Sequence, residues 1–334
     1  MKTTQQRHAR RIQRVIDYIH SHSTEGIDSA AVAEVAQLST YHWHRIYVAV
    51  TGESAVATLR RVRLERSASA LLREDRTVAQ IASECGFDNL QAFTRLFSRT
   101  YGLPPGKFRT KYVSRKQESK MDAAARSTTV TASAVSTNSP QSQSQSQSQS
   151  QSQSQSQSQS GDPESHPVVS VIDEQAFNRP VDIAEQVPLR LVGLWHSGDY
   201  NEIGRVFEKV MAAAEIESWP RSEAYSVGVY FDDPDVVPVE CCRSFAGIPV
   251  YKDFRAPDGY DSREVSGGLY ATCLHTGPYA LLPESYRWLY REWLRDSARD
   301  ARDSPCHEIY LNTPYNTHPS ALETMICLPL EGSG

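Results

Sequence analysis

A run of ten Gln-Ser dipeptides, from Gln141 to Ser160, interrupts this 334-residue chain. The run offers no apolar side chain to a core, so burial cannot offset the conformational entropy that ordering would remove. Low-complexity composition continues on both sides of it. We therefore predict two folded domains, residues 1–113 and 187–334, joined by a disordered Gln/Ser-rich linker over residues 114–186.

The predicted linker also limits how firmly the two domains can be oriented. A random coil of about 65 residues has an end-to-end distance of roughly 45 Å. The domains are therefore expected to be oriented loosely, if at all. Aggregation or phase separation of the polar tract is the alternative, and the lack of aromatic residues makes it the weaker of the two.

Charge is divided unevenly between the two parts of the chain. Residues 1–120 hold 20 Lys and Arg against 11 Asp and Glu, and the remaining residues hold 15 against 29. Lys and Arg contacts to phosphate dominate nucleic-acid affinity. The basic part therefore favours a polyanionic partner, and the acidic part argues against DNA binding there.

The composition also argues against several other classes of protein. No segment approaches the roughly 18 consecutive apolar residues of a membrane helix, and the N-terminus runs into an amphipathic pattern instead of a signal peptide. The six cysteines form no Cys-x-x-Cys pair and no zinc-type spacing with histidine, so we interpret them as buried thiols. We expect a cytoplasmic protein with no membrane partner, no metal site and no cofactor.

The basic part repeats one helical pattern. The segment "VAEVA" at 32–36 matches "VAQIA" at 78–82, and the arginine and glycine of "RIYVAVTG" at 45–52 match those of "RLFSRTYG" at 95–102. Each copy predicts a short helix, a turn and a second helix with one apolar face, which is the helix-turn-helix pattern. The expected helix boundaries are N-caps at Asp28 and Thr77 and stops at Gly52, Gly86 and Gly102.

A longer helix is predicted between the two copies, over "SAVATLRRVRLERSASALLRED" at 54–75. About 20 residues of helix span about 30 Å. Successive major grooves on one face of DNA lie about 34 Å apart. The connecting helix could therefore hold two reading heads one turn of DNA apart within a single chain.

The two copies and the connecting helix share one set of spaced residues: Val35-Ala36, Ser39, Arg45, Gly52, Arg63-Leu64, Ala68, Leu71-Leu72, Ile81-Ala82, Gly86-Phe87, Phe93, Arg95, Phe97, Gly102, Pro105, Phe108 and Arg109. With this set, residues 8–112 resemble the DNA-binding domain of AraC-family transcription regulators. One departure is Pro104, where the family usually has a Ser or Thr cap. The resemblance implies an all-α tandem helix-turn-helix domain, with double-stranded DNA and RNA polymerase as partners.

The resemblance also implies which side chains face the bases. These are Tyr41, His44 and Arg45 in the first head and Gln91, Thr94 and Arg95 in the second. Arginine can bind guanine O6 and N7 in a bidentate manner, and glutamine can do the same for adenine N6 and N7. A salt bridge at the border of the core is the alternative role for Arg45 and Arg95.

The acidic part is also doubled. The segment "WHSGDY" at 195–200 matches "LHTGPY" at 274–279 with an offset of 79, and Pro234 and Pro314 match with an offset of 80. Short apolar runs predict strands and "IGRVFEKVMAAAE" predicts a helix. We expect an α+β domain of two strand-helix-strand-strand copies about a pseudo-twofold axis, with a cleft at the seam.

With the strand "EIYLN" and the ending "MICLPL", residues 187–330 are similar to the GyrI-like effector-binding domain. The resemblance implies that this domain binds small, often lipophilic and cationic molecules. It places them in a cleft lined by aromatic side chains around one acidic residue.

The repeat singles out Glu308 as that acidic residue. The second copy has Glu308 where the first has Gly228, on the same strand face as Tyr310. A carboxylate beside aromatic rings can pair with a cation that stacks on them. An exposed glutamate at a strand end is the alternative. Trp195, Tyr270 and Trp293 are further candidates for the ligand-binding cleft.

We interpret the chain as a one-component transcription regulator that reads DNA and senses a small effector, and we expect no enzymatic activity. One alternative is that the C-terminal domain hydrolyses a small electrophile, since a carboxylate and aromatic rings would suffice for a weak activity. The other is that it captures another protein. His196 and His275 lack a recognisable nucleophile and acid, so we interpret them as turn residues.

Overall fold

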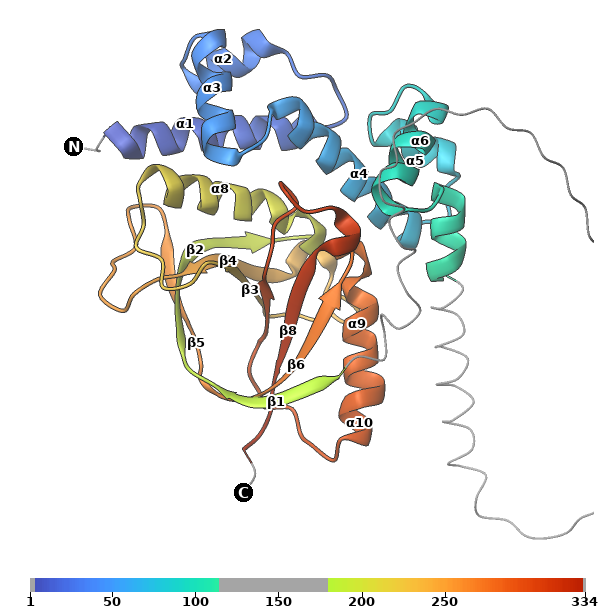
Figure 1. Cartoon of the computed structure of the whole chain (residues 1–334), viewed down its shortest axis with the longest axis vertical. Coiled ribbons are helices and arrows are strands. Elements are labelled where there is room, and N and C mark those ends of the chain that lie inside the picture. Colours follow the sequence, from blue (N-terminus) through green and yellow to red (C-terminus); the bar gives the residue numbers. More distant parts are fainter. Residues whose placement is uncertain (1–3, 114–179, 333–334) are drawn as a thin grey trace, which may run out of the picture.

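The computed structural model describes residues 4–113 and 180–332 (Figure 1). We call the first range the helical region and the second the sheet domain. Nearly all of the predicted Gln/Ser-rich linker lies outside the described residues. No helix within the described ranges is both long enough and apolar enough to cross a membrane.

The helical region contains the two predicted helix-turn-helix units, joined by a long helix. The first unit is α2 with α3, the second is α5 with α6, and α4 connects them (Figure 1). The chain is helical again from residue 105. The bounds are α1 (Thr4–Ser21), α2 (Ser29–Ala36), α3 (Thr40–Thr51), α4 (Ala55–Arg73), α5 (Val78–Glu84) and α6 (Leu90–Tyr101).

Local capping chemistry fixes these boundaries as the sequence predicts. The Asp28 side chain accepts a hydrogen bond from the Ala30 amide at 2.8 Å, and Thr77 forms a reciprocal capping box with Gln80. At their C-terminal ends, α3 and α6 reach left-handed caps at Gly52 and Gly102. The predicted helix limits are therefore confirmed.

Each helix-turn-helix unit has its own core. In the first, α1 adds Ile12, Val15, Ile16 and Ile19 to the buried face of α3, which carries Trp43 and Tyr47. In the second, the aromatic rings of Phe93, Phe97 and Phe108 pack with centroid distances of 5.3–5.5 Å. Two separate cores make each unit a distinct head on the shared helix α4.

The sheet domain is built on an antiparallel sheet of eight described strands, in the order β1-β6-β8-β7-β3-β4-β2-β5. Helices α8 (Ile203–Ile216) and α9 (Leu282–Trp288) lie on one face. The strands are β1 (Val181–Gln186), β2 (Leu189–Ser197), β3 (Ser226–Tyr230), β4 (Arg243–Pro249), β5 (Asp261–Val265), β6 (Gly268–Thr276), β7 (Cys306–Tyr310) and β8 (Glu323–Pro329).

Strands β1 and β5 extend each predicted copy by one element. Each strand precedes its own copy in sequence but pairs with the other, β1 with β6 and β5 with β2. The two halves therefore exchange their first strands. The domain boundary predicted at 187 is accordingly wrong, because β1 begins at Val181. This edge strand is mostly exposed, so it lacks the apolar alternation by which strands are recognised.

A π-helical turn explains why the repeat offset changes from 79 to 80. Helix α8 starts at Ile203 and α9 at Leu282, whereas the left-handed residues that follow the two helical segments are Ser218 and Ala298. One extra residue is therefore absorbed within the second helical segment. It lies in the π-helical turn η5 (Leu289–Trp293), which separates α9 from α10 (Leu294–Asp296).

The two domains pack directly against each other, contrary to the prediction of loose orientation. Helix α1 lies along α8, which is sandwiched between α1 and the sheet (Figure 1). Ala212 of α8 is buried in the first helix-turn-helix core, and Ala9 of α1 is buried with the α8 face of the sheet. The prediction considered only the tether, and no property of a tether opposes docking of the surfaces that it joins.

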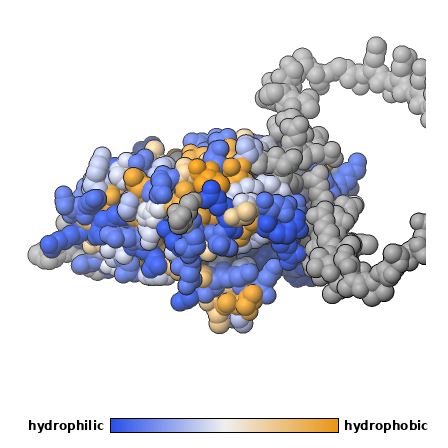
Figure 2. All heavy atoms as spheres, turned by 90° about the horizontal axis from the view of Figure 1, so that it is seen from below, coloured by the Kyte–Doolittle hydropathy of each residue, from blue (hydrophilic) through white to orange (hydrophobic). Residues whose placement is uncertain are grey.

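One face of the molecule and the cysteines bear on further composition-based expectations. The face shown in Figure 2 is mostly hydrophilic, with hydrophobic areas among the hydrophilic residues. Five of the six cysteines are buried as predicted, whereas Cys241 is exposed. No group of three or more His, Cys, Asp and Glu side chains within residues 4–113 and 180–332 is arranged to hold a metal ion.

Candidate nucleic-acid interface and ligand site

The second helix of each helix-turn-helix unit presents polar side chains to solvent. His44 and Arg45 on α3 are exposed, as are Gln91 and Arg95 on α6. Thr94 is half-buried, and its hydroxyl donates a 2.8 Å hydrogen bond to the Leu90 carbonyl. The side chain of Tyr41 lies outside the described part of the structure.

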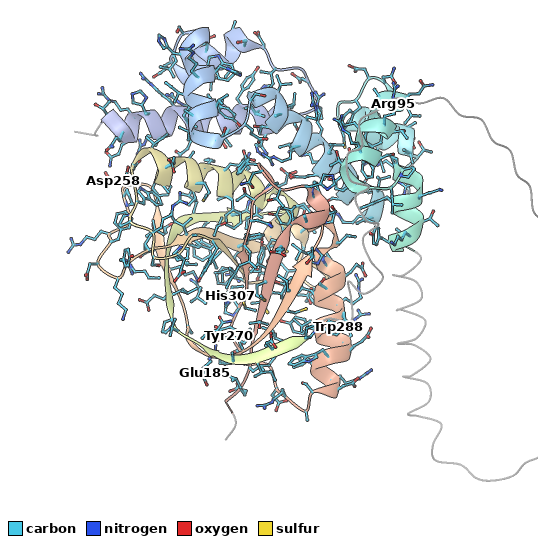
Figure 3. All side chains as sticks on the ribbon, in the orientation of Figure 1. Arg95, Glu185, Asp258, Tyr270, Trp288 and His307 are labelled. Atoms are coloured by element: carbon cyan, nitrogen blue, oxygen red, sulfur yellow. The ribbon has the colours of Figure 1, made fainter. Side chains whose placement is uncertain are left out.

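These helices remain open although the two domains are docked. Arg95 lies on α6, away from the part of the sheet that holds Tyr270 and His307, so its side chain is not covered by that part of the sheet (Figure 3). On the opposite side of each unit, Trp43 and Phe93 are buried in the cores. The arrangement therefore leaves one solvent face on each head, as insertion into a groove requires.

Part of the positive charge of the helical region is used for docking. Arg66 and Arg73 of α4 pair with Glu202 and Asp199 of the sheet domain, each at 2.9 Å. Ser69, between them, donates a 2.8 Å hydrogen bond to the side chain of Asn201. The uneven charge of the two domains therefore contributes to their docking, since acidic residues of the sheet domain bind basic residues of the helical region.

The candidate ligand site lies at the centre of the sheet. Strands β3 and β7 are the central pair, and Gly228 lies directly opposite Glu308. These residues are also equivalent in the repeat, so the pseudo-twofold axis passes between them. A Cβ atom at Gly228 would lie 3.0 Å from the Tyr230 ring, so the space beside this glycine is already occupied. One carboxylate without a symmetric counterpart therefore lies on the axis.

Pairs of equivalent aromatic residues surround this carboxylate. Tyr230 and Tyr310 are related by the repeat and join through their hydroxyls at 2.5 Å. Tyr200 contacts Tyr230 at a centroid distance of 4.8 Å, and its equivalent Tyr279 contacts Tyr310 at 5.5 Å. We call the following residues the Glu308 site: Glu308, Tyr230, Tyr310, Tyr200, Tyr279, Phe207 and its equivalent Tyr286.

Hydrogen bonds in the Glu308 site run toward the carboxylate. The Tyr310 hydroxyl donates to Glu308 Oε2 at 2.5 Å and accepts from Tyr230. The Tyr286 hydroxyl is also buried, and it interacts with the Glu308 carboxyl group. Glu308 is only 3% exposed, and this burial raises its pKa to about 7 although the tyrosine hydroxyls lower it. The carboxyl group therefore changes charge near neutral pH.

The alternative of an exposed glutamate at a strand end is thus excluded for Glu308. Glu308 and Tyr310 share the helix-covered face of the sheet, as predicted. What the site can do chemically follows from these groups: a buried carboxylate among aromatic rings can neutralise a cation that also stacks on the rings.

Trp195 and Tyr270 do not lie in the Glu308 site, contrary to the prediction. Side chains alternate between the faces of a strand, and Leu194 packs toward α8, so Trp195 points to the other face. There it is 47% exposed and contacts Phe231 at 5.3 Å. Tyr270 also lies on that face, with an edge contact of 5.1 Å to buried His307 (Figure 3).

The third candidate, Trp293, lies in the π-helical turn η5 and packs against the core under the second helical segment. His196 and His275 were predicted to be turn residues, but both lie within strands, one residue before the ends of β2 and β6. His196 binds the Asp199 carbonyl at 3.0 Å, and His275 binds Ser285 Oγ at 2.8 Å, both through ring nitrogens.

Sequence reasoning missed five aromatic members of the Glu308 site. Each has an aromatic equivalent at an offset of 79 or 80, so a search of the repeat for paired aromatic residues would have found them. The missed residues are Tyr200, Phe207, Tyr230, Tyr279 and Tyr286.

Comparisons with known families match both domains. A helix-turn-helix domain family matches residues 32–111, and the GyrI-like small molecule binding domain matches residues 179–331. The HTH-type transcriptional regulator YbfP of Bacillus subtilis is 37% identical over 114 residues, which is 33% of this chain and 39% of that protein. The chain thus spans about two fifths of the length of this regulator.

The sheet domain has its own relative. The DNA gyrase inhibitor of Citrobacter rodentium is 30% identical over 137 residues, which is 40% of this chain and 83% of that protein. Among solved structures, the DNA-binding domain of AdpA in complex with a target DNA is 25% identical, with a TM-score of 0.30. The match covers 32% of this chain and 96% of that one.

Proposed function

The chain belongs to the AraC-type helix-turn-helix regulators and carries a C-terminal GyrI-like small-molecule-binding domain, and on this premise we propose how it works. Helices α3 and α6 bind double-stranded DNA, and the Glu308 site binds a small, lipophilic, cationic effector. The protein acts in the cytoplasm, where the chromosome is, and RNA polymerase is the further partner through which bound protein changes transcription.

The solvent-exposed faces of α3 and α6, which the connecting helix α4 joins, support the DNA-reading part of this proposal. Helix α4 has 19 residues and is therefore about 28 Å long. The groove repeat is about 34 Å, and α3 and α6 belong to units at opposite ends of α4 (Figure 1), so two adjacent major grooves are within reach. His44 and Arg45 would read one groove, and Gln91 and Arg95 the next, with Tyr41 and Thr94 beside them.

The buried Glu308 carboxyl carries the effector part of the proposal. A neutral carboxylic acid needs no counter-ion, whereas the ionised form is costly at 3% exposure unless a cation is bound. Cation binding would therefore favour the ionised form, and the surrounding rings would contribute cation–π contacts of about 0.5–2 kcal/mol each. We propose binding without turnover, because among the described residues of the Glu308 site the polar groups are one carboxyl group and the tyrosine hydroxyls.

Selection of bound DNA from a random pool tests the proposal. The full-length chain should enrich sequences with two conserved segments about 10 base pairs apart, one for each head. The second arm adds benzyltriethylammonium, a lipophilic cation, and measures its binding by calorimetry. If no sequence is enriched, the DNA-reading assignment is wrong. If DNA is bound but the cation is not, the effector class is wrong.

A further inference from the structure

An arginine of the connecting helix is held by side chains from the sheet domain. Arg61, in the middle of α4, is only 14% exposed, and its Nη2 lies 2.8 Å from Glu208 Oε1 and 2.7 Å from Glu53 Oε1. Its guanidinium lies over the Tyr315 ring at 5.0 Å from the centroid. Glu208 belongs to α8 and Tyr315 to the β7–β8 loop, residues 311–322. We call Arg61, Glu208 and Tyr315 the Arg61 clamp.

Glu208 also binds the first helix of the chain. Its Oε2 lies 3.0 Å from His20 Nε2 of α1, and both side chains are buried. Burial opposes ionisation, yet His20 and Arg61 together lower the Glu208 pKa to about 2, so the carboxylate remains charged. If Glu208 moved away, Arg61 would keep Glu53 but lose one of its two close carboxylate partners, and buried His20 would lose the carboxylate that it binds. A displacement of α8 is therefore resisted by both α1 and α4.

The Arg61 clamp adjoins the Glu308 site, because Glu208 of the clamp and Phe207 of the site are consecutive residues of α8. Consecutive helical residues point about 100° apart. Phe207 therefore faces the sheet, where its ring contacts Tyr310 at 5.0 Å, while Glu208 faces the helical region. Tyr310 is also the last residue of β7, directly before the loop that carries Tyr315. Two routes thus lead from Tyr310 to Arg61, one through α8 and one through the loop.

The second head is reached as well. Tyr279 contacts Tyr310, and Leu281, two residues later, is buried in the core of the second helix-turn-helix unit. In the β7–β8 loop, His318 Nε2 binds the Arg99 carbonyl of α6 at 3.2 Å. Side chains in contact with Tyr310 are therefore connected to both heads and to the helix between them.

The two copies of the repeat differ at this loop. In the first copy, residues 231–242 form the equivalent loop, and Asp235 stands where the second copy has Tyr315. Asp235 is exposed, and its backbone amide binds Asp233 in the same loop. Only the second copy therefore places an aromatic ring against the connecting helix, and this is also the copy that carries Glu308.

We propose that the Arg61 clamp is the joint through which occupancy of the Glu308 site changes the arrangement of the two DNA-reading heads. This inference rests on the proposed function and adds the route of its regulation. A bound effector must displace the ring of Phe207 or Tyr310, because these rings contact each other beside the Glu308 carboxylate. Densely packed elements shift between discrete arrangements and do not deform continuously. Movement of either ring is therefore passed to Arg61 through Glu208 or Tyr315.

Hydrogen exchange of the full-length chain tests the route without any ligand. At pH 8, Glu308→Gln removes the charge from the site, and we expect amide exchange of residues 55–66 of α4 to change by about threefold or more. In a Tyr315→Ala background this response should be clearly reduced, because only the route through Glu208 remains. The matched control is Asp235→Ala, the same position in the first copy, which should leave the response intact. The proposal is overturned if Glu308→Gln changes amide exchange in β7 but not in residues 55–66 of α4.

The second arm measures coupling. In wild type, benzyltriethylammonium should change affinity for a selected DNA site by about fivefold or more. Glu208→Gln and Tyr315→Ala should each bind cation and DNA separately but lower that factor, and the double variant should reduce it to about one. Wild-type coupling in both variants overturns the clamp. A failure of the effector class is distinguishable, because it appears as a lack of cation binding by wild type, while the exchange experiment remains informative.

Discussion

The buried carboxyl of Glu308 predicts an unusual dependence of stability on pH. Its pKa is about 7 in the folded protein and about 4.5 in an exposed chain. Between these values the folded protein holds a proton that the unfolded chain has released. Folding stability therefore falls as pH rises through this window, which is the reverse of the usual behaviour of acidic groups. The Glu308→Gln variant lacks this dependence, because its amide does not titrate.

The magnitude follows from the distance between the two pKa values. A separation of about 2.5 at 1.36 kcal/mol per pH unit amounts to about 3 kcal/mol, of which about 2.5 kcal/mol falls between pH 5 and pH 8. Glutamine keeps an oxygen that accepts the hydrogen bond from Tyr310, so little else changes at the site. Relative to Glu308→Gln, wild type should lose about 2.5 kcal/mol of stability from pH 5 to pH 8.

The difference between the two proteins is the quantity to measure, because His307 titrates in the opposite sense. Burial lowers the His307 pKa to about 4, from 6.5 for an exposed histidine. Its folded form therefore holds fewer protons than the unfolded chain in that window, and stability is lost as pH falls from 6.5 to 4. Both proteins contain His307, so its contribution cancels in the difference.

Urea unfolding of the full-length proteins at pH 5, 6, 7 and 8 provides the assay, with exposed Glu264→Gln as the control for loss of a carboxylate. The control should track wild type at every pH. A wild-type minus Glu308→Gln difference that is the same at pH 5 and pH 8 would refute the reasoning. Calorimetry in buffers of different ionisation enthalpy adds a second reading: cation binding at pH 7 should release about half a proton from wild type and none from Glu308→Gln.

Other predictions concern the heads, the tether and the packing of the sheet. Arg45→Ala and Arg95→Ala should each cost about 1–3 kcal/mol on a selected DNA site and leave nonspecific binding nearly unchanged, whereas the control Arg291→Ala, at an exposed position, should change neither affinity. Wild-type affinity in both head variants would contradict the groove assignment. Halving the run at 141–160 should leave DNA and cation affinities within about twofold by fluorescence anisotropy and calorimetry, and a large loss of either would make the tract a binding site. Gly228→Ala should lower stability by about 1–3 kcal/mol in urea unfolding, because its methyl group meets the Tyr230 ring, and an unchanged midpoint would contradict that packing.

Local pattern in the sequence determined the helical region almost completely. Capping residues such as Asp28 and Thr77, and glycines at helix ends, act within a few residues of themselves, so the boundaries can be read directly from the chain. The apolar faces of α3 and α6 follow the helical period, which predicted the burial of Trp43 and Phe93. Both cores were therefore predictable.

The doubled sheet domain was predictable only in outline. Its copies were visible as matching segments, and the comparison of Gly228 with Glu308 identified the central carboxylate. The edge strand β1 was missed, because an exposed strand has no apolar face to show. Trp195 and Tyr270 were assigned to the wrong face of the sheet. The repeat shows which residues of the two copies are equivalent, but it does not show to which face a side chain points, and a shift of one residue along a strand reverses that face.

Tertiary structure alone decided how the two domains meet. The sequence shows a basic part and an acidic part, but opposite charge is compatible with both DNA binding and docking, and only the contacts of Arg66, Arg73 and Arg61 distinguish the two. Glu208 and Tyr315 lie about 150 and 250 residues from Arg61 in sequence. Helix and strand periodicity relates only residues that are close in sequence, so it could not predict these contacts. The raised pKa of Glu308 also depends on the tertiary structure. It is caused by burial, and burial is produced by all the segments that pack around Glu308, so no single segment of the sequence predicts it.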